Sequence, residues 1–118
     1  METTRIFNSA DYFQPAEGEP IRSVVTESKD AVVVAWHVKP GQSIRPHIHP
    51  SGQDTWTILS GSGRYFLEQD GTSQQIKAGD VVIAPTAALH GVLNNGTVPL
   101  VFISVVSPAD AGYELMAL

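Results

Sequence analysis

The sequence predicts an all-β barrel or sandwich, and three observations support that prediction. From residue 21 to residue 106 the chain is a succession of short, alternating segments rich in β-branched residues. Turn-forming residues separate these segments at intervals of roughly eight to twelve residues, the spacing typical of such folds. No segment has a sustained apolar period of 3.6 residues, so neither long amphipathic helices nor strand–helix–strand units are expected.

Composition narrows the class of protein. The 118 residues suffice for one domain with a core of its own, and the 42% hydrophobic content is typical of a soluble globular protein. The net charge of −5, with no basic cluster, argues against nucleic-acid binding. No apolar run is long enough for a membrane helix, and the N-terminus lacks the apolar core of a secretory signal, so we expect a cytoplasmic protein. Without cysteines, any metal must be held by nitrogen and oxygen.

The first twenty residues are expected to form an arm. Apolar residues up to Phe13 are scattered among polar ones, and a stretch rich in proline and glycine follows. This pattern is too irregular for a central strand. We therefore predict an arm over residues 1–20, laid on the outside of the sheet or on a partner subunit.

The barrel itself is expected to occupy residues 21–106. The two strongest hairpin signals are Asp70-Gly71 and Asn95-Gly96, because such turns need φ > 0. Strands are predicted at residues 21–26, 31–38, 44–49, 54–60, 63–68, 73–77, 80–84, 89–94 and 98–106.

Residues 107–118 are expected to form a tail packed over one end of the barrel. The tail is predicted to begin with one short helical turn, because Ser107 can cap it, Pro108 suits its first position and Gly112 can end it.

Two histidines and an aspartate are expected to converge at one end of the predicted barrel. His47 and His49 are two residues apart in an alternating strand, so both imidazoles point to the same face. If residues 50–53 form a loop between paired strands, Asp54 lies directly opposite His49 and Trp56 opposite His47.

A third histidine, His90, lies just past another turn, in the stretch from Gly79 to Asn94. Three neutral imidazoles clustered inside an apolar barrel would leave lone pairs unmet, whereas a divalent cation uses them directly. The sequence therefore predicts a metal site.

These residues resemble two motifs of the cupin family. The first motif is Gly, five residues, His-x-His, three or four residues, Glu, six residues, Gly. Its positions are occupied here by Gly41, His47, His49, Asp54 and Gly61. The second motif is Gly, five residues, Pro-x-Gly, two residues, His, three residues, Asn. Its positions are occupied by Gly79, Pro85, Ala87, His90 and Asn94. The sequence departs from the pattern twice, with Asp54 in place of Glu and Ala87 in place of the middle Gly.

The resemblance implies a double-stranded β-helix, the cupin jelly-roll barrel, in which the three histidines and the acidic residue face the interior. In the family they hold one metal ion and leave positions open for water, dioxygen or substrate. Imidazole and carboxylate ligands suit iron, manganese, nickel, zinc or copper alike, so ligand type does not identify the metal.

The family includes both enzymes and binding modules, so the fold alone does not decide the function. Our first hypothesis is a metal-dependent oxygenase, lyase or isomerase acting on a small organic molecule, with dioxygenase-like chemistry favoured. The alternative is a non-catalytic module that binds metal or a small ligand. Small cupins commonly pair through peripheral strands, which implies a homodimer.

Asp54 is one methylene shorter than the family's glutamate, so its carboxylate reaches about 1.5 Å less far. Either the metal sits closer to its strand, or a water bridges the gap, or the three histidines hold the metal with an extra open position. We favour a three-histidine site in which Asp54 is a long, water-bridged or outer partner. Gln53 is a rival for the same position, but the next motif gap would then end at Ser60 instead of Gly61.

Three residues are candidates for the ligand pocket. Arg45 shares strand parity with the two neighbouring histidines and could hold a substrate carboxylate through two hydrogen bonds, although arginines at strand ends are more often exposed. Trp56 could line the pocket or belong simply to the core. Gln53 could support the metal ligands from outside the metal's own coordination shell.

Overall fold

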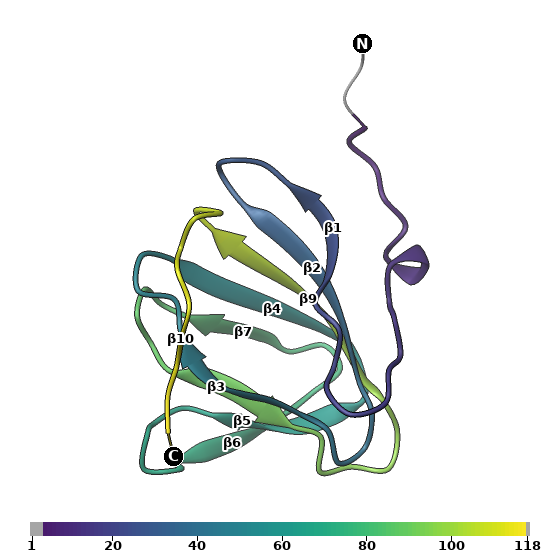
Figure 1. Cartoon of the computed structure of the whole chain (residues 1–118). Helices are drawn as coiled ribbons and strands as arrows, with labels where there is room; N and C mark the ends of the chain where they lie inside the picture. Colours follow the sequence, from purple (N-terminus) through teal and green to yellow (C-terminus); the bar gives the residue numbers. More distant parts are fainter. Residues whose placement is uncertain (1–3, 118) are drawn as a thin grey trace.

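The computed structural model describes residues 4–117, which form two antiparallel five-stranded sheets (Figure 1). The first sheet contains, in spatial order, β1 (Ser23–Glu27), β2 (Val32–Val38), β9 (Leu100–Ser107), β4 (Gln53–Ser60) and β7 (Val81–Ala84). The second contains β10 (Glu114–Leu115), β3 (Ser43–Ile48), β8 (His90–Leu93), β5 (Ser62–Phe66) and β6 (Ser73–Lys77). The predicted all-β class is therefore confirmed.

The chain passes from one sheet to the other after almost every strand. Only β1–β2 and β5–β6 are hairpins between consecutive strands of one sheet. Because inward and outward side chains alternate along each strand, both sheets direct every second residue into the space between them. That space holds a core of Val38, Trp56, Ile58, Tyr65, Ile76, Val92, Leu100 and Phe102.

Sharp passages between the sheets require glycine at particular points. Gly61 connects β4 to β5 with φ +79°, and a Cβ at this position would lie 2.1 Å from the carbonyl oxygen of Pro99. No side chain fits there without moving the backbone of the neighbouring segment. The glycine that ends the first motif is thus a requirement of the crossing between sheets.

Two of the predicted turns do not form hairpins. β3 and β4 belong to different sheets, so residues 50–53 cross the barrel, and the predicted opposition of His49 and Asp54 in a hairpin is wrong. Asn95-Gly96 likewise connects β8 to β9 in the other sheet. Asp70-Gly71 does join the hairpin β5–β6. A turn sequence allows a reversal of the chain but does not determine which sheet the next strand joins.

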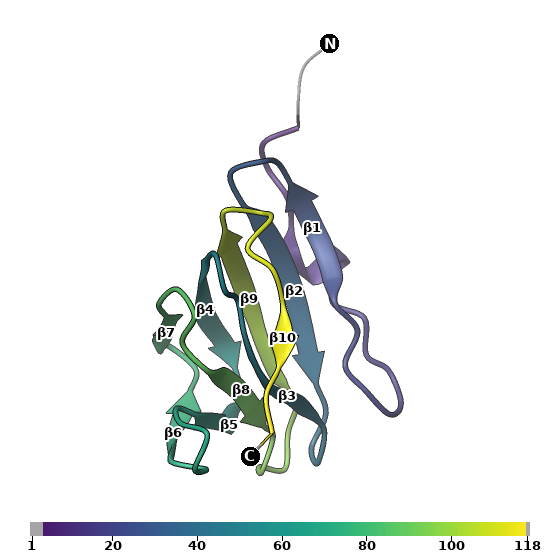
Figure 2. The same ribbon diagram turned by 60° about the vertical axis from the view of Figure 1, so that its left-hand side comes forward.

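The N-terminal segment runs beside β1 and extends beyond the body of the barrel (Figures 1 and 2). It contains one short 3-10 helix, Ser9–Asp11. Where the segment passes the sheet, Ser23 Oγ donates a hydrogen bond to the Tyr12 carbonyl and accepts one from Gln14 Nε2 at 2.9 Å. Ile6, further out, is 91% exposed.

The C-terminal tail is a strap, and the helical turn predicted at its start is wrong. The Ala111 carbonyl accepts from the Ser51 N–H at 2.8 Å, and β10 pairs with β3. Backbone groups that one isolated helical turn would have used are thus taken by neighbouring segments, and a single turn gains too few bonds to offset its nucleation. Figure 2 shows the strap passing in front of the barrel.

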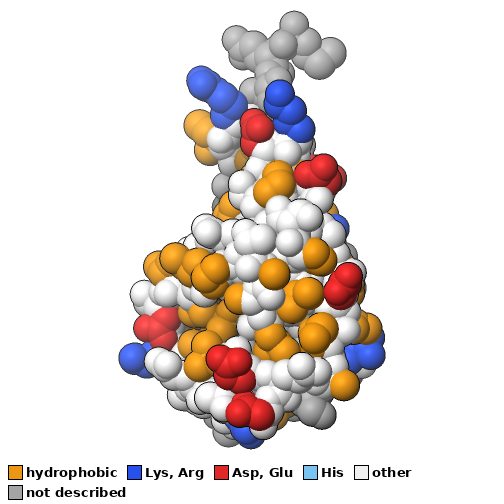
Figure 3. Space-filling model, turned by 90° about the vertical axis from the view of Figure 1, so that its left-hand side faces the viewer, with side chains coloured by type: hydrophobic (Ala, Val, Ile, Leu, Met, Phe, Trp, Pro, Cys, Tyr) orange, Lys and Arg blue, Asp and Glu red, His pale blue; other side chains and the backbone are white. Residues whose placement is uncertain are grey.

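Several large apolar side chains remain exposed, and hydrophobic groups gather over the body on the face drawn in Figure 3. On the outer face of the first sheet, Val81 is 62% and Ile83 is 54% exposed. Within residues 4–117 no helix is long and apolar enough to span a bilayer.

Candidate metal centre

Four side chains converge at one end of the barrel interior. His47 comes from β3, His90 from β8, Asp54 from β4 in the opposing sheet, and His49 directly follows β3. One ligand atom from each lies within 4.8 Å of the others. His47, Asp54 and His90 are at most 4% exposed, and His49 is half-buried. The structure thus brings together all four residues that the motifs predicted as metal ligands.

Strand register explains why two of the histidines meet. His47 and His90 are direct partners across the β3–β8 ladder, and their ring centroids lie 4.2 Å apart. The ladder shifts register between Ile44 and His47, a β-bulge that changes the direction of the side chains beyond it. Gly91 makes this approach possible, because a Cβ there would lie 2.8 Å from the Ile44 carbonyl oxygen.

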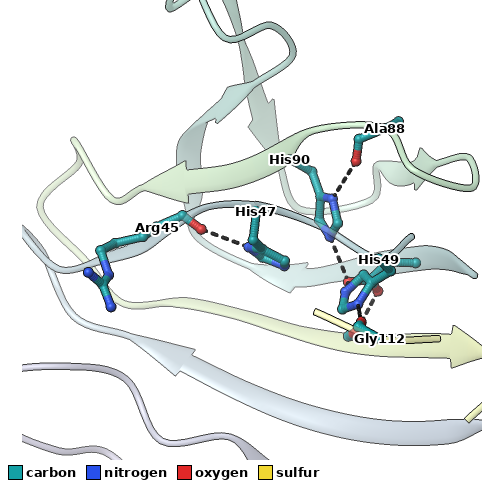
Figure 4. Close-up of polar contacts among 8 residues, drawn as sticks. Arg45, His47, His49, Ala88, His90 and Gly112 are labelled. Atoms are coloured by element: carbon teal, nitrogen blue, oxygen red, sulfur yellow. Dashed lines mark hydrogen bonds and ion pairs between the residues drawn. The ribbon is translucent and has the colours of Figure 1, made fainter. Parts of the chain in front are cut away.

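Each imidazole is oriented by a backbone carbonyl (Figure 4). The Nδ1–H groups donate to the carbonyl of Arg45 at 2.7 Å for His47, to that of Gly112 at 2.8 Å for His49, and to that of Ala88 at 3.0 Å for His90. Since a carbonyl oxygen only accepts, all three Nδ1 atoms must carry hydrogen. In the neutral ring Nε2 is then a free lone pair, the state in which histidine binds metal.

Asp54 places its carboxylate against two of these lone pairs. Its Oδ2 lies 3.0 Å from Nε2 of His90 and 3.4 Å from Nε2 of His49. Its Oδ1 accepts a hydrogen bond from Ser104 Oγ at 2.6 Å. A carboxylate oxygen and an unprotonated Nε2 repel each other at such distances, so the cluster requires a cation between them, either a proton or a metal ion.

The pKa values in the metal-free cluster reflect the balance between burial, which disfavours charged side chains, and hydrogen bonds, which favour them. Burial, together with the neighbouring His90, lowers the pKa of His47 to about 4. Burial also opposes the charge of His49, but its hydrogen bonds to Asp54 and to the Gly112 carbonyl outweigh that and raise its pKa. Burial would raise the pKa of Asp54, yet the hydrogen bonds from His49, His90 and Ser104 hold it well below its ordinary value.

The four donors fit a single divalent ion. Metal–nitrogen and metal–oxygen bonds of about 2.0–2.2 Å place two ligands of one ion roughly 3–4 Å apart. The Asp54–His90 and Asp54–His49 separations fall in this range, and the widest separation of 4.8 Å needs only a small contraction. The cluster is therefore a group that could bind metal.

A cavity of about 330 Å³ opens beside the cluster. It is lined by Arg22, Val34, Trp36, Ile44, His47, His49, Asp54, Trp56, Ser104, Val106 and Tyr113. Its wall is largely apolar with a few polar groups at the metal centre, which is the usual character of a small-molecule site.

The predicted pocket residues fare differently. Trp56 lines the cavity and also belongs to the core. Arg45 is exposed, points away from the histidines and borders a separate small cavity, because the bulge before His47 breaks the assumed parity (Figure 4). Gln53 is exposed and bonds only to Thr55, so it does not approach the ligands. Its outward position follows from its place beside inward-facing Asp54.

Sequence reasoning missed three contributors to the site. The Gly112 carbonyl and the ring of Tyr113 come from the strap, which brings Tyr113 to 5.0 Å from the His47 ring centroid. Arg22 comes from the segment before β1. The alternation around β10 is too short to indicate a strand, and the role of a backbone carbonyl leaves no signal in the sequence.

Fold and site together define a class: a small antiparallel barrel of two sheets with histidines and a carboxylate converging inside one end. The family model for the cupin domain matches residues 34–106, more than half of the chain and all four clustered residues. This chain belongs to the cupin family.

Comparison with solved structures confirms the double-stranded β-helix. An uncharacterised conserved protein with a double-stranded β-helix domain from Klebsiella pneumoniae subsp. pneumoniae is 48% identical with a TM-score of 0.94, covering 98% of this chain and 100% of that one. A "predicted oxalate decarboxylase" of Thermotoga maritima is 21% identical with a TM-score of 0.73, covering 88% of this chain and 99% of that one. The second likeness concerns the fold alone.

A longer curated relative shares part of the sequence. Germin-like protein 5-1 of Oryza sativa subsp. japonica is 27% identical over 85 residues, which is 68% of this chain and 37% of that protein. The chain thus spans little more than a third of the length of this relative.

Proposed function

We propose that the chain binds one divalent metal ion through Nε2 of His47, His49 and His90 and the carboxylate of Asp54, and that it acts on a small organic molecule in the adjoining cavity. One observation carries this proposal: three imidazoles with Nδ1–H fixed by carbonyls converge with one buried carboxylate, which lies against Nε2 of His49 and His90. A divalent cation satisfies all four groups at once.

The spacing favours Asp54 as a direct ligand over the water-bridged arrangement that its shorter side chain suggested. Its Oδ2 is already at ligand spacing from His90 and His49. A bridging water would require the carboxylate to stand back from the histidines. Two further features support direct ligation despite the missing methylene: Asp54 faces inward from β4 in the opposing sheet, and Ser104 holds its second carboxylate oxygen.

The metal would supply Lewis acidity or a site for dioxygen. The chain's own residues would hold the ion, orient the imidazoles and line the adjoining cavity with a largely apolar wall. Among residues 4–117, the cavity lining contains two ionisable side chains besides the proposed ligands, Tyr113 and Arg22. Arg22 is permanently charged, so only Tyr113 can give up or accept a proton. With so few acid–base groups, chemistry centred on the metal is favoured, so we propose an oxygenase before a lyase or isomerase.

Metal stoichiometry of purified variants tests the site. We expect His49→Ala and Asp54→Ala each to lower metal content and affinity strongly. Gln53→Ala is the matched control, since Gln53 is next in sequence but faces outward. Asp54→Ala protein that keeps a full complement of metal with unchanged affinity would rule out direct ligation by Asp54.

The alternative remains a non-catalytic binding module, which the scarcity of acid–base groups also fits. Oxygen consumption by the iron(II)-loaded protein with a panel of small acids and phenols separates the two proposals. Turnover with any of them, lost in His49→Ala, supports an oxygenase. Binding without oxygen consumption supports the module.

We further propose that the chain is a homodimer formed through the outer face of the first sheet. Val33, Ile103, Val105, Val81 and Ile83 point outward there, and the last two are more than half exposed. Five strands about 4.8 Å apart and about seven residues long present roughly 500 Å². With the projecting arm, a second copy could bury the ~800 Å² per partner of a standard interface.

Light scattering tests this assembly. We expect twice the chain mass at micromolar concentration and the mass of a single chain for Ile83→Glu. A monomer for the unmodified protein would contradict the proposal.

A further inference from the structure

Arg22 gives the cavity at the metal centre a positive charge without a protein counter-ion. It lies directly before β1 and lines the cavity together with His47, His49 and Asp54. The three ion pairs among residues 4–117 involve Lys39, His49 and His90, and none includes Arg22. Arg22 is itself exposed, so a ligand that enters the cavity can reach its guanidinium.

Trp56 also lines the cavity, but it is 2% exposed and its indole Nε1–H is buried out of reach of a ligand oxygen. Arg22 is therefore the positively charged donor of the lining that a ligand oxygen can contact.

The charge balance around the cavity points the same way. Three neutral imidazoles, Asp54 and a divalent ion leave one positive charge at the centre, and Arg22 adds another. Two uncompensated positive charges beside an apolar wall favour an anionic ligand over a neutral one. The charge at the centre rests on the proposed metal site, whereas the charge of Arg22 is present with or without the metal.

The volume and the lining of the cavity limit the size and the polarity of the rest of the ligand. The cavity of about 330 Å³ has room for roughly ten water-sized groups of ~30 Å³ each. Val34, Trp36, Ile44, Val106 and Tyr113 supply aliphatic and aromatic surface. The body of the ligand is therefore small and apolar.

We propose that the cavity binds small organic monocarboxylates, with Arg22 holding the carboxylate and the aliphatic and aromatic wall holding the apolar body. The guanidinium presents paired N–H donors that match the two carboxylate oxygens. Arg22, and not Arg45, is then the residue that makes the cavity prefer an anionic ligand over a neutral one.

Binding of benzoate and benzamide tests the proposal, because the two have nearly the same shape and differ in charge. The two tryptophans of the chain, Trp36 and Trp56, both line the cavity, so intrinsic fluorescence reports binding. The variants are Arg22→Gln, Arg45→Gln as the rival arginine, and Arg64→Gln as a control away from both cavities. Each protein is titrated metal-loaded and metal-stripped, with its metal content measured.

We expect benzoate to bind at least about tenfold more tightly than benzamide, and Arg22→Gln to remove most of that preference while its metal content stays full. Arg45→Gln and Arg64→Gln should bind benzoate like the unmodified protein. The dependence on Arg22 should persist, more weakly, in metal-stripped protein.

Three results would overturn the inference: equal affinity for the two probes, no benzoate binding at millimolar concentration, or a preference lost in Arg45→Gln and kept in Arg22→Gln. An unmodified protein that takes up no metal would instead contradict the proposed metal site. In that case the dependence on Arg22 in metal-stripped protein still decides the inference.

Discussion

The two ends of the barrel interior are built on the same strands but differ in chemistry. On β4, Ile58 faces the dry core, Trp56 contacts both the core and the cavity, and Asp54 faces the metal centre. On β9 the inward series runs from Leu100 and Phe102 to Ser104. One end is filled by side chains, and the other surrounds a cavity of about 330 Å³.

The difference shows how a small barrel combines a rigid scaffold with a polar site. The hydrogen-bonded ladder fixes the spacing of β4 and β9, and Trp56 stacks on Phe102 with centroids 4.2 Å apart. At the polar end the same pairing sets Asp54 beside Ser104, and Asp54 lies across from His90. We therefore expect substitutions at the dry end to act on stability and substitutions at the polar end to act on metal and ligand binding.

The largest expected effect is at the dry end. Phe102 is fully buried, and Phe102→Ala should lower the free energy of unfolding by about 3–5 kcal/mol because it leaves a cavity beside Trp56. Chemical denaturation measures this, with Thr57→Ala, at an exposed position of β4, as control. Folded Phe102→Ala protein should still bind one metal ion per chain. Loss of metal from the folded variant would show that the two ends are not separable.

The second-largest expected effect is a loss of metal affinity when the C-terminal strap is shortened. A chain ending at Asp110 loses the Gly112 carbonyl that orients His49, and we expect its metal affinity to fall about 10–100-fold. A chain ending at Leu115 keeps Gly112 and β10 and serves as the matched control. Equal affinity for both truncated chains, each shown to be folded by circular dichroism, would contradict the orienting role of the strap.

The pH dependence of metal binding tests the protonation of the histidines at the polar end. The pKa of His49 is raised, so metal-free protein keeps a proton there to above pH 6.5, and the metal must displace it. Affinity should therefore rise about tenfold per pH unit up to the pKa of His49 and level off above it. His47, with a pKa of about 4, is already neutral and adds slope only near that pH. Calorimetric titrations from pH 5 to 8 measure the slope, and a flat profile would exclude proton displacement at His49.

The smallest expected effect concerns the departure from the cupin pattern at Ala87. This residue has φ 66°, in the left-handed region that costs about 1–2 kcal/mol for a residue with a side chain. Its N–H donates to the His49 carbonyl at 3.0 Å. Ala87→Gly should raise stability by less than about 1 kcal/mol, since the unfolded chain also gains freedom. Thermal unfolding beside Ala88→Gly measures it, and a clear loss of stability would contradict strain at Ala87.

The sequence predicted the fold class and the four clustered residues because both depend on local spacing. Alternation marks strands, and the two motifs fix which residues face inward. What it could not predict depends on contacts between distant segments. The Gly112 carbonyl meets His49 although the two residues are 63 positions apart in the sequence.

Counting alternate residues along the sequence also assigns the wrong face where a strand is irregular. The bulge between Ile44 and His47 turns Arg45 outward, although counting by twos from His47 places it inside. Arg22 reaches the cavity from a segment that precedes the first strand, where alternation gives no information. The pairing of strands into sheets was likewise missed at residues 50–53, because a turn permits either sheet.

Titration of metal-stripped, unmodified protein with a divalent ion, followed by calorimetry and thermal unfolding, tests whether the four residues form a metal centre. We expect one ion bound per chain and a melting temperature that rises with ion concentration, because an ion that binds only the folded chain stabilises it by mass action. His90→Ala should show neither, while Gln53→Ala should show both. Binding by His90→Ala equal to that of the unmodified protein, or no uptake by either, would contradict the claim that the four residues form a metal centre.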